Sequence, residues 1–296
     1  MPESLWPALD WAEWQTTADT LHMATQIVGK TRLALTPLQN HWWNVPLYVS
    51  ARGLTTSPMP LADGGLLEIE FDILAHLLEF RMSTGKTRTI ALRAQTVAAF
   101  YAEYLETLKS LKVEVKIKPM PVEVAAPIRF DLDETYASYD REAVERFHQV
   151  LMRCATLFKL FSTRFLGKIS PVHFFWGSFD LCVTRFSGRR ASGPPRPDKM
   201  QAEAYSHEVI SCGFWPGNGG YGAAAFYCYA APVPPGLGEK KVHPGGWNEA
   251  MGEFLLPYDD VRAAADADAA VLDFLQATYV AAADCAAWDR RALERS

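Results

Sequence analysis

The spacing of apolar residues switches between a helical period and a strand-like period along the chain. Apolar side chains recur at helical spacing over residues 11–33, directly after Asp10, a residue type that favours the N-cap of a helix. Helical spacing returns at residues 95–111. Between these two stretches, alternating apolar and polar positions predict four strands, at 45–52, 66–73, 76–83 and 87–92. The first part of the chain therefore predicts the order helix, four strands, helix.

The second part of the chain repeats this order at a larger scale. Asp140 precedes a long helical pattern that ends near residue 166, and an alanine-rich helix is predicted at 267–285. Four strands are predicted between these helices, at 172–186, 206–214, 223–231 and 252–256. Two segments rich in proline and glycine predict long loops, at 187–204 and 232–251. Alternating valines and charges at 113–117 predict a further strand between the two parts.

Matching segments occupy equivalent places in the two parts. A Gly-Lys pair ends a helical stretch at residues 29–30 and again at 167–168. A proline follows each pair, and then a histidine beside large aromatic residues, which is His41 in the first part and His173 in the second. These matches predict an internal duplication, and the seam between two repeats is a place where ligand sites tend to form.

The expected fold class is α+β, built from a duplicated unit of helix, four antiparallel strands and helix. In this arrangement residues 47–50 are expected to superpose on residues 181–184. The order of elements resembles that of TATA-binding proteins and of helix-grip folds, a likeness of fold that implies no activity. Three segments are expected, namely a first repeat at 1–118, an extended proline-containing crossing at 119–139 and a second repeat at 140–296, with the repeats packed tightly together.

Charge and composition narrow the class of protein. A formal net charge of -5 argues against a nucleic-acid partner, because such proteins present a broad basic surface. No apolar run approaches the length that crosses a bilayer, and the first ten residues lack the pattern of a signal peptide, so no membrane partner is expected. The five cysteines have no C-x-x-C spacing, which is typical of reduced thiols. We expect a cytoplasmic protein.

Three histidines are candidates for chemistry, namely His41, His173 and His207. If the repeats face one another, these side chains converge and suit a divalent metal such as zinc. Alternatively, they act as acid–base groups, with Asp180 as the carboxylate that orients His207. A third interpretation is that the histidines are buried hydrogen-bonding residues that tie strands together. The spacing leaves all three interpretations open, and the cofactor unknown.

Aromatic residues provide the denser signal. Consecutive aromatics on a strand point to both faces, so some of them face a cavity or an interface rather than one core. The expected cavity walls are Trp42, Trp43, Phe175 and Trp176. Polar residues among and beside them are expected to orient a ligand, namely Asn44, Ser178, Arg185 and Glu208.

Three phrases resemble a family of uncharacterised, mainly bacterial proteins that is described as a domain of unknown function. They are residues 40–49, residues 170–181, and residues 205–208 together with 213–217. The resemblance extends over nearly the whole chain. It implies no established activity, cofactor or catalytic residue.

Two hypotheses from different classes follow from the residues. The first is a protein, and in one form an enzyme, that binds a small molecule in a cleft between the repeats, with the histidines at its centre and aromatic walls. The second is a non-catalytic interaction or scaffolding protein whose exposed aromatics contact a partner or a second copy of the chain. The first hypothesis requires a concave pocket that holds at least two of the three histidines, and the second requires an open apolar surface.

Overall fold

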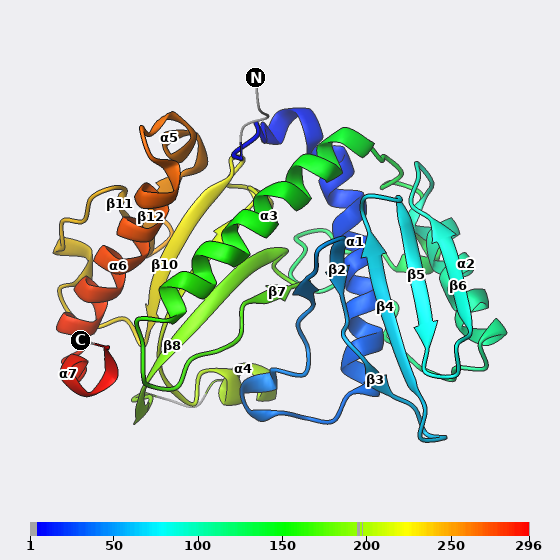
Figure 1. Ribbon diagram of the computed structural model, residues 1–296, viewed down its shortest axis with the longest axis horizontal. Helices are drawn as coiled ribbons and strands as arrows, with labels where there is room; N and C mark the ends of the chain where they lie inside the picture. The colour runs from blue at the N-terminus through cyan, green and yellow to red at the C-terminus, as the bar shows by residue number, and fades with distance from the viewer. Residues whose placement is uncertain (1–4, 194–195, 197, 296) are drawn as a thin grey trace.

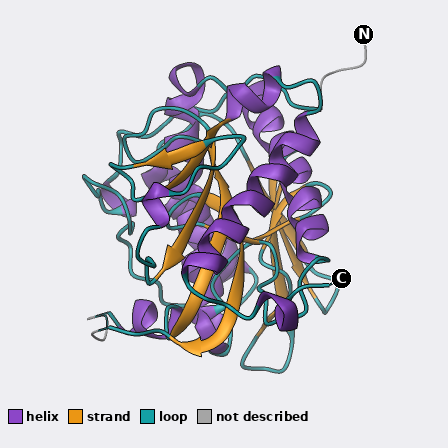
Figure 2. Cartoon of the chain, turned by 90° about the vertical axis from the view of Figure 1, so that its left-hand side faces the viewer, coloured by secondary structure: helices purple, strands orange, loops and turns teal. Residues whose placement is uncertain are grey.

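The computed structural model describes residues 5–193, 196 and 198–295. In these ranges the chain forms helices and two antiparallel sheets of six strands each, an α+β fold (Figure 1). A view turned by 90° shows the helices lying beside the strands (Figure 2). No helix among the described residues has the length and apolar character that a membrane span requires.

The first half of the chain places one long helix before the first sheet and one shorter helix after it. Its elements are α1 (Trp11–Leu35), η1 (Asn40–Trp42), β1 (Tyr48–Val49), β2 (Gly53–Thr55), β3 (Met59–Pro60), β4 (Leu66–Asp72), β5 (Leu77–Met82), β6 (Thr87–Ala91) and α2 (Val97–Ser110). The strand order is β1-β2-β4-β5-β6, and β3 also pairs with β4. Asp10 and Thr96 cap the two helices by accepting backbone N–H groups of the first turn.

The second half has the same plan with longer strands. Its elements are η2 (Phe130–Leu132), α3 (Arg141–Ser162), β7 (His173–Phe175), β8 (Asp180–Arg190), α4 (Lys199–Ala204), β9 (His207–Trp215), β10 (Ala225–Ala231), η3 (Leu237–Glu239), β11 (Gly246–Asn248), β12 (Glu253–Pro257), α5 (Tyr258–Ala263), α6 (Ala267–Cys285) and α7 (Arg290–Leu293). The strand order is β11-β12-β10-β9-β8-β7. Helix α3 lies in front of this sheet, whereas α1 and α2 lie behind the first sheet (Figure 1).

Reciprocal contacts join the two halves. Leu47 and Phe174 exchange two backbone hydrogen bonds of 2.9 Å, which link the β1 end of one sheet to β7 of the other. His22 of α1 contacts the carbonyl oxygens of Trp176 and Gly177 in the turn after β7. His148 of α3 contacts Ser50 O in the turn after β1. This exchange is what a duplicated unit with a pseudo-twofold axis would produce, and the duplication itself stays a prediction.

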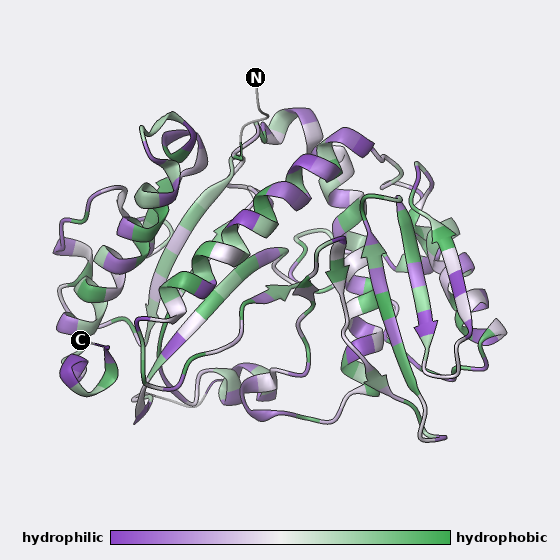
Figure 3. Cartoon of the chain, in the orientation of Figure 1, coloured by the Kyte–Doolittle hydropathy of each residue, from purple (hydrophilic) through white to green (hydrophobic). Residues whose placement is uncertain are grey.

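The outward faces of the two sheets differ in chemistry. On β4, Ile69 and Phe71 are buried in the core, while the alternate residues Glu68 and Glu70 pair with Arg81 of β5. The alternation of apolar and polar residues is visible along the strands of this sheet (Figure 3). The outward face of the second sheet has no comparable set of ion pairs among its described residues. It carries aromatic, hydroxyl, thiol and carboxyl groups instead, and it lines the candidate site described below.

Several strand predictions are wrong in detail. The strand expected at 172–186 is split into β7 and β8 by a turn at residues 176–179, where Phe179 has a positive φ of 61° and donates its backbone N–H to Phe175 O. The aromatic residues there have strand propensity, but their local backbone reverses direction. Residues 113–117 form no strand, because no strand pairs with them, although their alternate side chains pack on the core.

Other differences concern segments that were too irregular to predict. Each sheet has six strands in the described residues, not four, because β2, β3 and β11 are too short to produce a period and one expected strand is split into β7 and β8. The loop expected at 187–204 contains the end of β8 and helix α4, and its residues 194, 195 and 197 lie outside the described residues. The superposition of 47–50 on 181–184 is also wrong. The first segment includes β1, the first strand of its sheet, whereas the second lies in β8, the second strand.

Candidate functional site

A cavity of about 630 Å³ lies on the outward face of the second sheet. Strands β7 to β10 form its floor, and the C-terminal part of α1, the segment around η1, helix α4 and the crossing residues Val122 and Glu123 cover it. Eight of the predicted site residues line this cavity, namely His41, Trp42, Trp43, His173, Phe175, Trp176, Ser178 and Asp180. Both halves of the chain therefore contribute walls, as the sequence predicts.

Side chains that alternate along the strands determine which residues form the floor of the cavity. Along β8, Leu181 and Val183 are buried in the main core, and the alternate residues Asp180, Cys182 and Thr184 line the cavity. The apolar residues of this outward face form two clusters of their own, separate from the main core, and these are centred on Cys182, Tyr227 and Leu255 and on Phe186, Val209 and Ala231. The cavity is therefore a second layer above the sheet and not a defect in the core.

Asp180 is a buried carboxyl group of the floor. It is 7% exposed, and it accepts hydrogen bonds from the hydroxyl groups of Ser178 and Tyr227. Tyr227 reaches Asp180 across Gly213, where a Cβ atom would lie 2.4 Å from the Tyr227 hydroxyl oxygen. Glycine at this position is thus a condition for the hydrogen bond between β10 and β8.

The charge of Asp180 acts on two further carboxyl groups, those of Glu123 in the cavity lining and Glu253 on β12. Burial raises the pKa of Asp180 above its usual range, against the opposing effect of the Ser178 and Tyr227 hydrogen bonds. Burial, and then the charge of Asp180, raises the pKa of Glu123. The same two causes raise the pKa of Glu253 on β12 to about 7. A pKa near 7 lets Glu253 hold a proton near neutral pH, which is the property of a general acid, and the pKa values of Asp180 and Glu123 are shifted in the same direction.

His173 is neutral at physiological pH. It is 1% exposed, and burial together with the charge of Arg32 lowers its pKa to about 3. Its Nε2 atom is buried without a hydrogen-bond partner among the described residues, and so is Nε1 of Trp42. Since both residues line the cavity, these nitrogens are two polar atoms that a bound molecule or water could satisfy. His173 can form a hydrogen bond, but its pKa is too low for proton transfer near neutral pH.

His41 holds the cover of the cavity in place. Its Nε2 accepts a hydrogen bond of 2.6 Å from Lys168 Nζ, which requires the Nδ1 atom to carry the proton and donate it to the carbonyl oxygens of Glu203 and Ala204 at the end of α4. Burial, and then the charge of Lys168, lowers the pKa of His41. His41 and the next residue, Trp42, both have left-handed backbone conformations, with φ of 56° and 59°. Such strain persists only where surrounding contacts maintain it.

The replacement His41→Ala is expected to loosen α4. It removes the hydrogen bonds to Glu203 and Ala204, and a hydrogen bond contributes about 1 kcal/mol, so amide exchange in α4 should accelerate by roughly five- to ten-fold. Hydrogen exchange followed by mass spectrometry measures this rate. His76→Ala, in the first half of the chain, is the control and should leave α4 unchanged. Unaltered exchange in α4 of the His41 variant would contradict the anchoring role.

The expected convergence of His41, His173 and His207 on a metal ion is not found. The ring of His207 lies 5.7 Å from the ring of His41, centroid to centroid, and its Nδ1 faces Ser206 Oγ. His173 packs against Trp43 and Phe175, and the Trp43 ring also contacts His41. Within the described ranges, no group of three or more histidine, cysteine, aspartate or glutamate side chains has a geometry that could hold a metal ion.

Three predicted ligand-binding residues lie outside the cavity. Arg185 alternates with Thr184 and therefore faces the opposite side of the sheet, where it is 1% exposed and packs on Phe161, 3.5 Å from the ring centroid. Glu208 forms an ion pair of 2.7 Å with Arg189. The buried amide of Asn44 accepts a hydrogen bond from Gln39 N. Each of these polar side chains makes contacts within the chain that stabilise the fold.

Several cavity residues were not among the predicted site residues. Tyr227 and Tyr229 line it from β10, and their alternation with the core residues Phe226 and Cys228 is a signal that could have identified them. Lys30 and Glu123 also line it. Nothing in the local pattern indicates Glu123, because it lies in an irregular crossing that is placed by tertiary packing alone.

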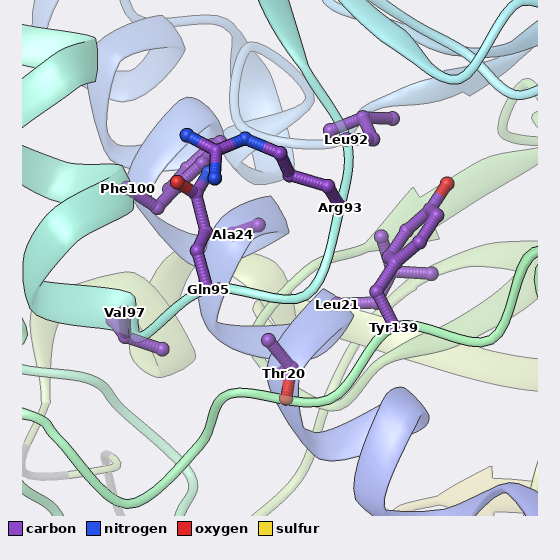
Figure 4. A pocket seen from close by; sticks show the side chains of 9 residues that line it. All are labelled: Thr20, Leu21, Ala24, Leu92, Arg93, Gln95, Val97, Phe100 and Tyr139. Carbon is purple, nitrogen blue, oxygen red and sulfur yellow. The ribbon is translucent and has the colours of Figure 1, made fainter.

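Other hollows are less suited to a ligand. A pocket between α1, the start of α2 and Tyr139 is lined by side chains that include Arg93 and Gln95, and it encloses about 20 Å³, space for roughly one water molecule (Figure 4). A wide groove beside α6 and β12 is flanked by Asp260, Asp266 and Asp273 and has no aromatic wall. The aromatic cavity is accordingly the candidate site.

Comparison with known proteins places the chain in a family but adds no function. No curated protein and no solved structure matches it. The model of DUF5996, a family of unknown function, matches residues 6–295, which is nearly the whole chain. This protein therefore belongs to the family of unknown function DUF5996.

Proposed function

We propose that this protein binds a small organic molecule in the aromatic cavity above its second sheet. The observation that carries the proposal is the outward face of β8 and β10, where Asp180, Cys182 and Tyr227 are turned away from the main core and line the cavity. A volume of about 630 Å³ lies within the range of ligand sites, ~300–1,000 Å³. Aromatic walls with a few orienting polar groups are the usual composition of such sites.

The carboxyl groups favour an acid–base enzyme as one form of this proposal. Asp180 and Glu123 line one cavity, and both have raised pKa values. The Tyr227 and Ser178 hydroxyl groups hold Asp180 in one orientation, as the geometry of proton transfer requires. The centre of the proposed site is therefore Asp180, and the neutral histidines serve as hydrogen-bonding and supporting groups.

The alternative of a scaffolding protein with exposed aromatics has less support. Trp42, Trp43, Phe175 and Trp176 line the cavity. The exposed large apolar residues, such as Leu38, Leu74 and Leu132, are aliphatic and occur in unrelated elements.

We also propose a cytoplasmic location, supported by five cysteines that are all unpaired thiols.

The replacement Thr184→Phe tests ligand binding, because it fills the middle of the cavity floor with a ring. The probe is 2-naphthylacetamide, a neutral molecule with an aromatic body and one polar group, and binding is measured by isothermal titration calorimetry. Wild type is expected to bind one equivalent, and the variant at least about ten-fold more weakly. Thr89→Phe is the matched control, since Thr89 is an exposed strand residue of β6 outside the cavity.

Three outcomes would sink the proposal. The first is that wild type binds none of the naphthyl probes. The second is that Thr184→Phe and Thr89→Phe bind the amide equally well. The third is that wild type binds well above one equivalent. Cooperative unfolding of Thr184→Phe must be recorded alongside, so that a loss of affinity reports on the cavity and not on the fold.

A further inference from the structure

Lys30 is a buried cation in the wall of the cavity. It belongs to the C-terminal part of α1, it is 7% exposed, and its Nζ lies 5.5 Å from the centroid of the Trp176 ring. Trp176 itself is fixed, because its Nε1 donates a hydrogen bond of 2.9 Å to Val45 O. The ammonium group is therefore held against one aromatic wall of the site.

No described carboxylate compensates this charge. The interactions of Lys30 with described residues are the contact with the Trp176 ring and repulsion by Lys118, a like charge from the crossing segment. Burial, and then the charge of Lys118, lowers the pKa of Lys30. A buried charge without a partner is costly, and a second ammonium group nearby increases that cost. An anion placed between the two lysines would remove both penalties.

The acidic groups of the cavity have partners other than Lys30. Asp180 is bonded to Ser178 and Tyr227, and Glu123 is influenced by Asp180, but neither forms an ion pair with Lys30. Burial raises the pKa of both carboxyl groups, and the charge of Asp180 raises that of Glu123 further. The cavity lining thus contains a lysine held against Trp176 and two carboxyl groups that form no ion pair with it.

We infer that the ligand is an organic anion with an aromatic or other flat apolar body. Its acidic group pairs with Lys30 and Lys118, its body lies along Trp176 and Phe175, and its far end reaches the hydrogen-bonding groups around Asp180. This inference rests on the proposed function and names the chemical class of the molecule. A carboxylate and a phosphate monoester share the chemistry that two lysines recognise.

The test uses four probes that share one naphthyl body. They are 2-naphthylacetate, 2-naphthyl phosphate, the neutral 2-naphthylacetamide and the cationic 2-(2-naphthyl)ethylamine, each titrated calorimetrically at pH 7.5 into the full chain. Wild type is expected to bind at least one of the two anions about ten-fold or more tightly than the amide, and the amine most weakly. The better of the two anions identifies the acidic group.

Lys30→Met is the decisive variant, because methionine keeps the apolar stem and removes the charge. It is expected to bind the anions no better than the amide, whereas its melting temperature should equal or exceed that of wild type, since a buried uncompensated charge is lost. Lys118→Met should show a smaller loss of anion preference. Lys86→Met removes one charge from the exposed turn between β5 and β6 and is the control, with wild-type affinities expected.

Each result distinguishes this inference from the proposed function. Equal affinity for amide and anions, preference for the amine, or an anion preference that survives in Lys30→Met overturns the inference and leaves the binding cavity standing. Failure of all four probes to bind overturns the proposed function and the inference with it. Anion preference that is lost in Lys30→Met and kept in Lys86→Met supports both.

Discussion

Lowering the pH from 7 to 5 is expected to reduce the free energy of unfolding by about 2 kcal/mol. His22 and His173 are buried as neutral rings, with pKa values of about 4 and about 3. In the unfolded chain both titrate near 6.5. Between pH 6.5 and 4 the unfolded chain therefore binds more protons than the folded chain at these two positions. Their contribution to stability is present above pH 6.5 and is lost as the pH falls.

Glu253 acts in the opposite direction. Its pKa is raised to about 7 in the folded chain, so its contribution is present at low pH and is lost as the pH rises toward 7. It offsets part of the histidine effect, by an amount that partial exposure to solvent reduces. Each histidine changes stability by up to about 1.4 kcal/mol per pH unit, and two histidines against one glutamate leave a net loss on acidification.

Urea unfolding at pH 7, 6 and 5 measures this dependence, and two variants separate its parts. His173→Asn should make the slope shallower, because one buried titrating ring is gone. Glu253→Gln should make it steeper, because the compensating group is gone. A slope that is flat in wild type, or that changes in the same direction in both variants, would show that these groups do not titrate as their burial implies.

The spacing of apolar residues along the sequence predicted most of the long helices and strands. The helix at 267–285 coincides with α6 (Ala267–Cys285), and the pattern over 11–33 identifies most of α1 (Trp11–Leu35). Strand β4 (Leu66–Asp72) agrees within a residue with the expected 66–73. These segments bury one regular face each, and burial of such a face is what produces a readable period. Short elements such as β3 (Met59–Pro60) bury too few residues for that.

The candidate site was partly predictable for a different reason. On β7, Phe174 enters the core and Phe175 lines the cavity, as alternation along a strand predicts. Trp42 and Trp43 reach the wall in another way, from η1 and the residue after it. The faces of Arg185 and Asp180 could not be assigned in the same way, because the split between β7 and β8 sets which residues of β8 point outward. The contribution of Glu123 depends on how the crossing packs against Gly177, which no local pattern encodes.

Truncation of Trp176 is expected to be the most destabilising single change at the cavity. Trp176 is 4% exposed, donates a hydrogen bond to Val45 O and lies directly on α1 at Gly29. Trp176→Ala should cost about 3–5 kcal/mol, because a large ring and its hydrogen bond are lost and a void forms between helix and sheet. Chemical unfolding measures this cost, and Trp176→Phe, which keeps a ring, should lose less.

Because Gly29 lies against the Trp176 ring, the effect of Gly29→Ala is expected to depend on whether Trp176 is present. A Cβ atom at Gly29 would lie 2.3 Å from Cγ and Cδ1 of Trp176, so Gly29→Ala should destabilise wild type by about 1–2 kcal/mol despite the better helix propensity of alanine. When Trp176 is alanine, the same change meets no ring and should stabilise by up to about 1 kcal/mol. A double-mutant cycle with Trp176 measures this coupling, and a cycle with the buried Trp288 should be additive. A Gly29→Ala effect of the same sign and size in both backgrounds would mean that α1 does not pack on this wall as the structure has it.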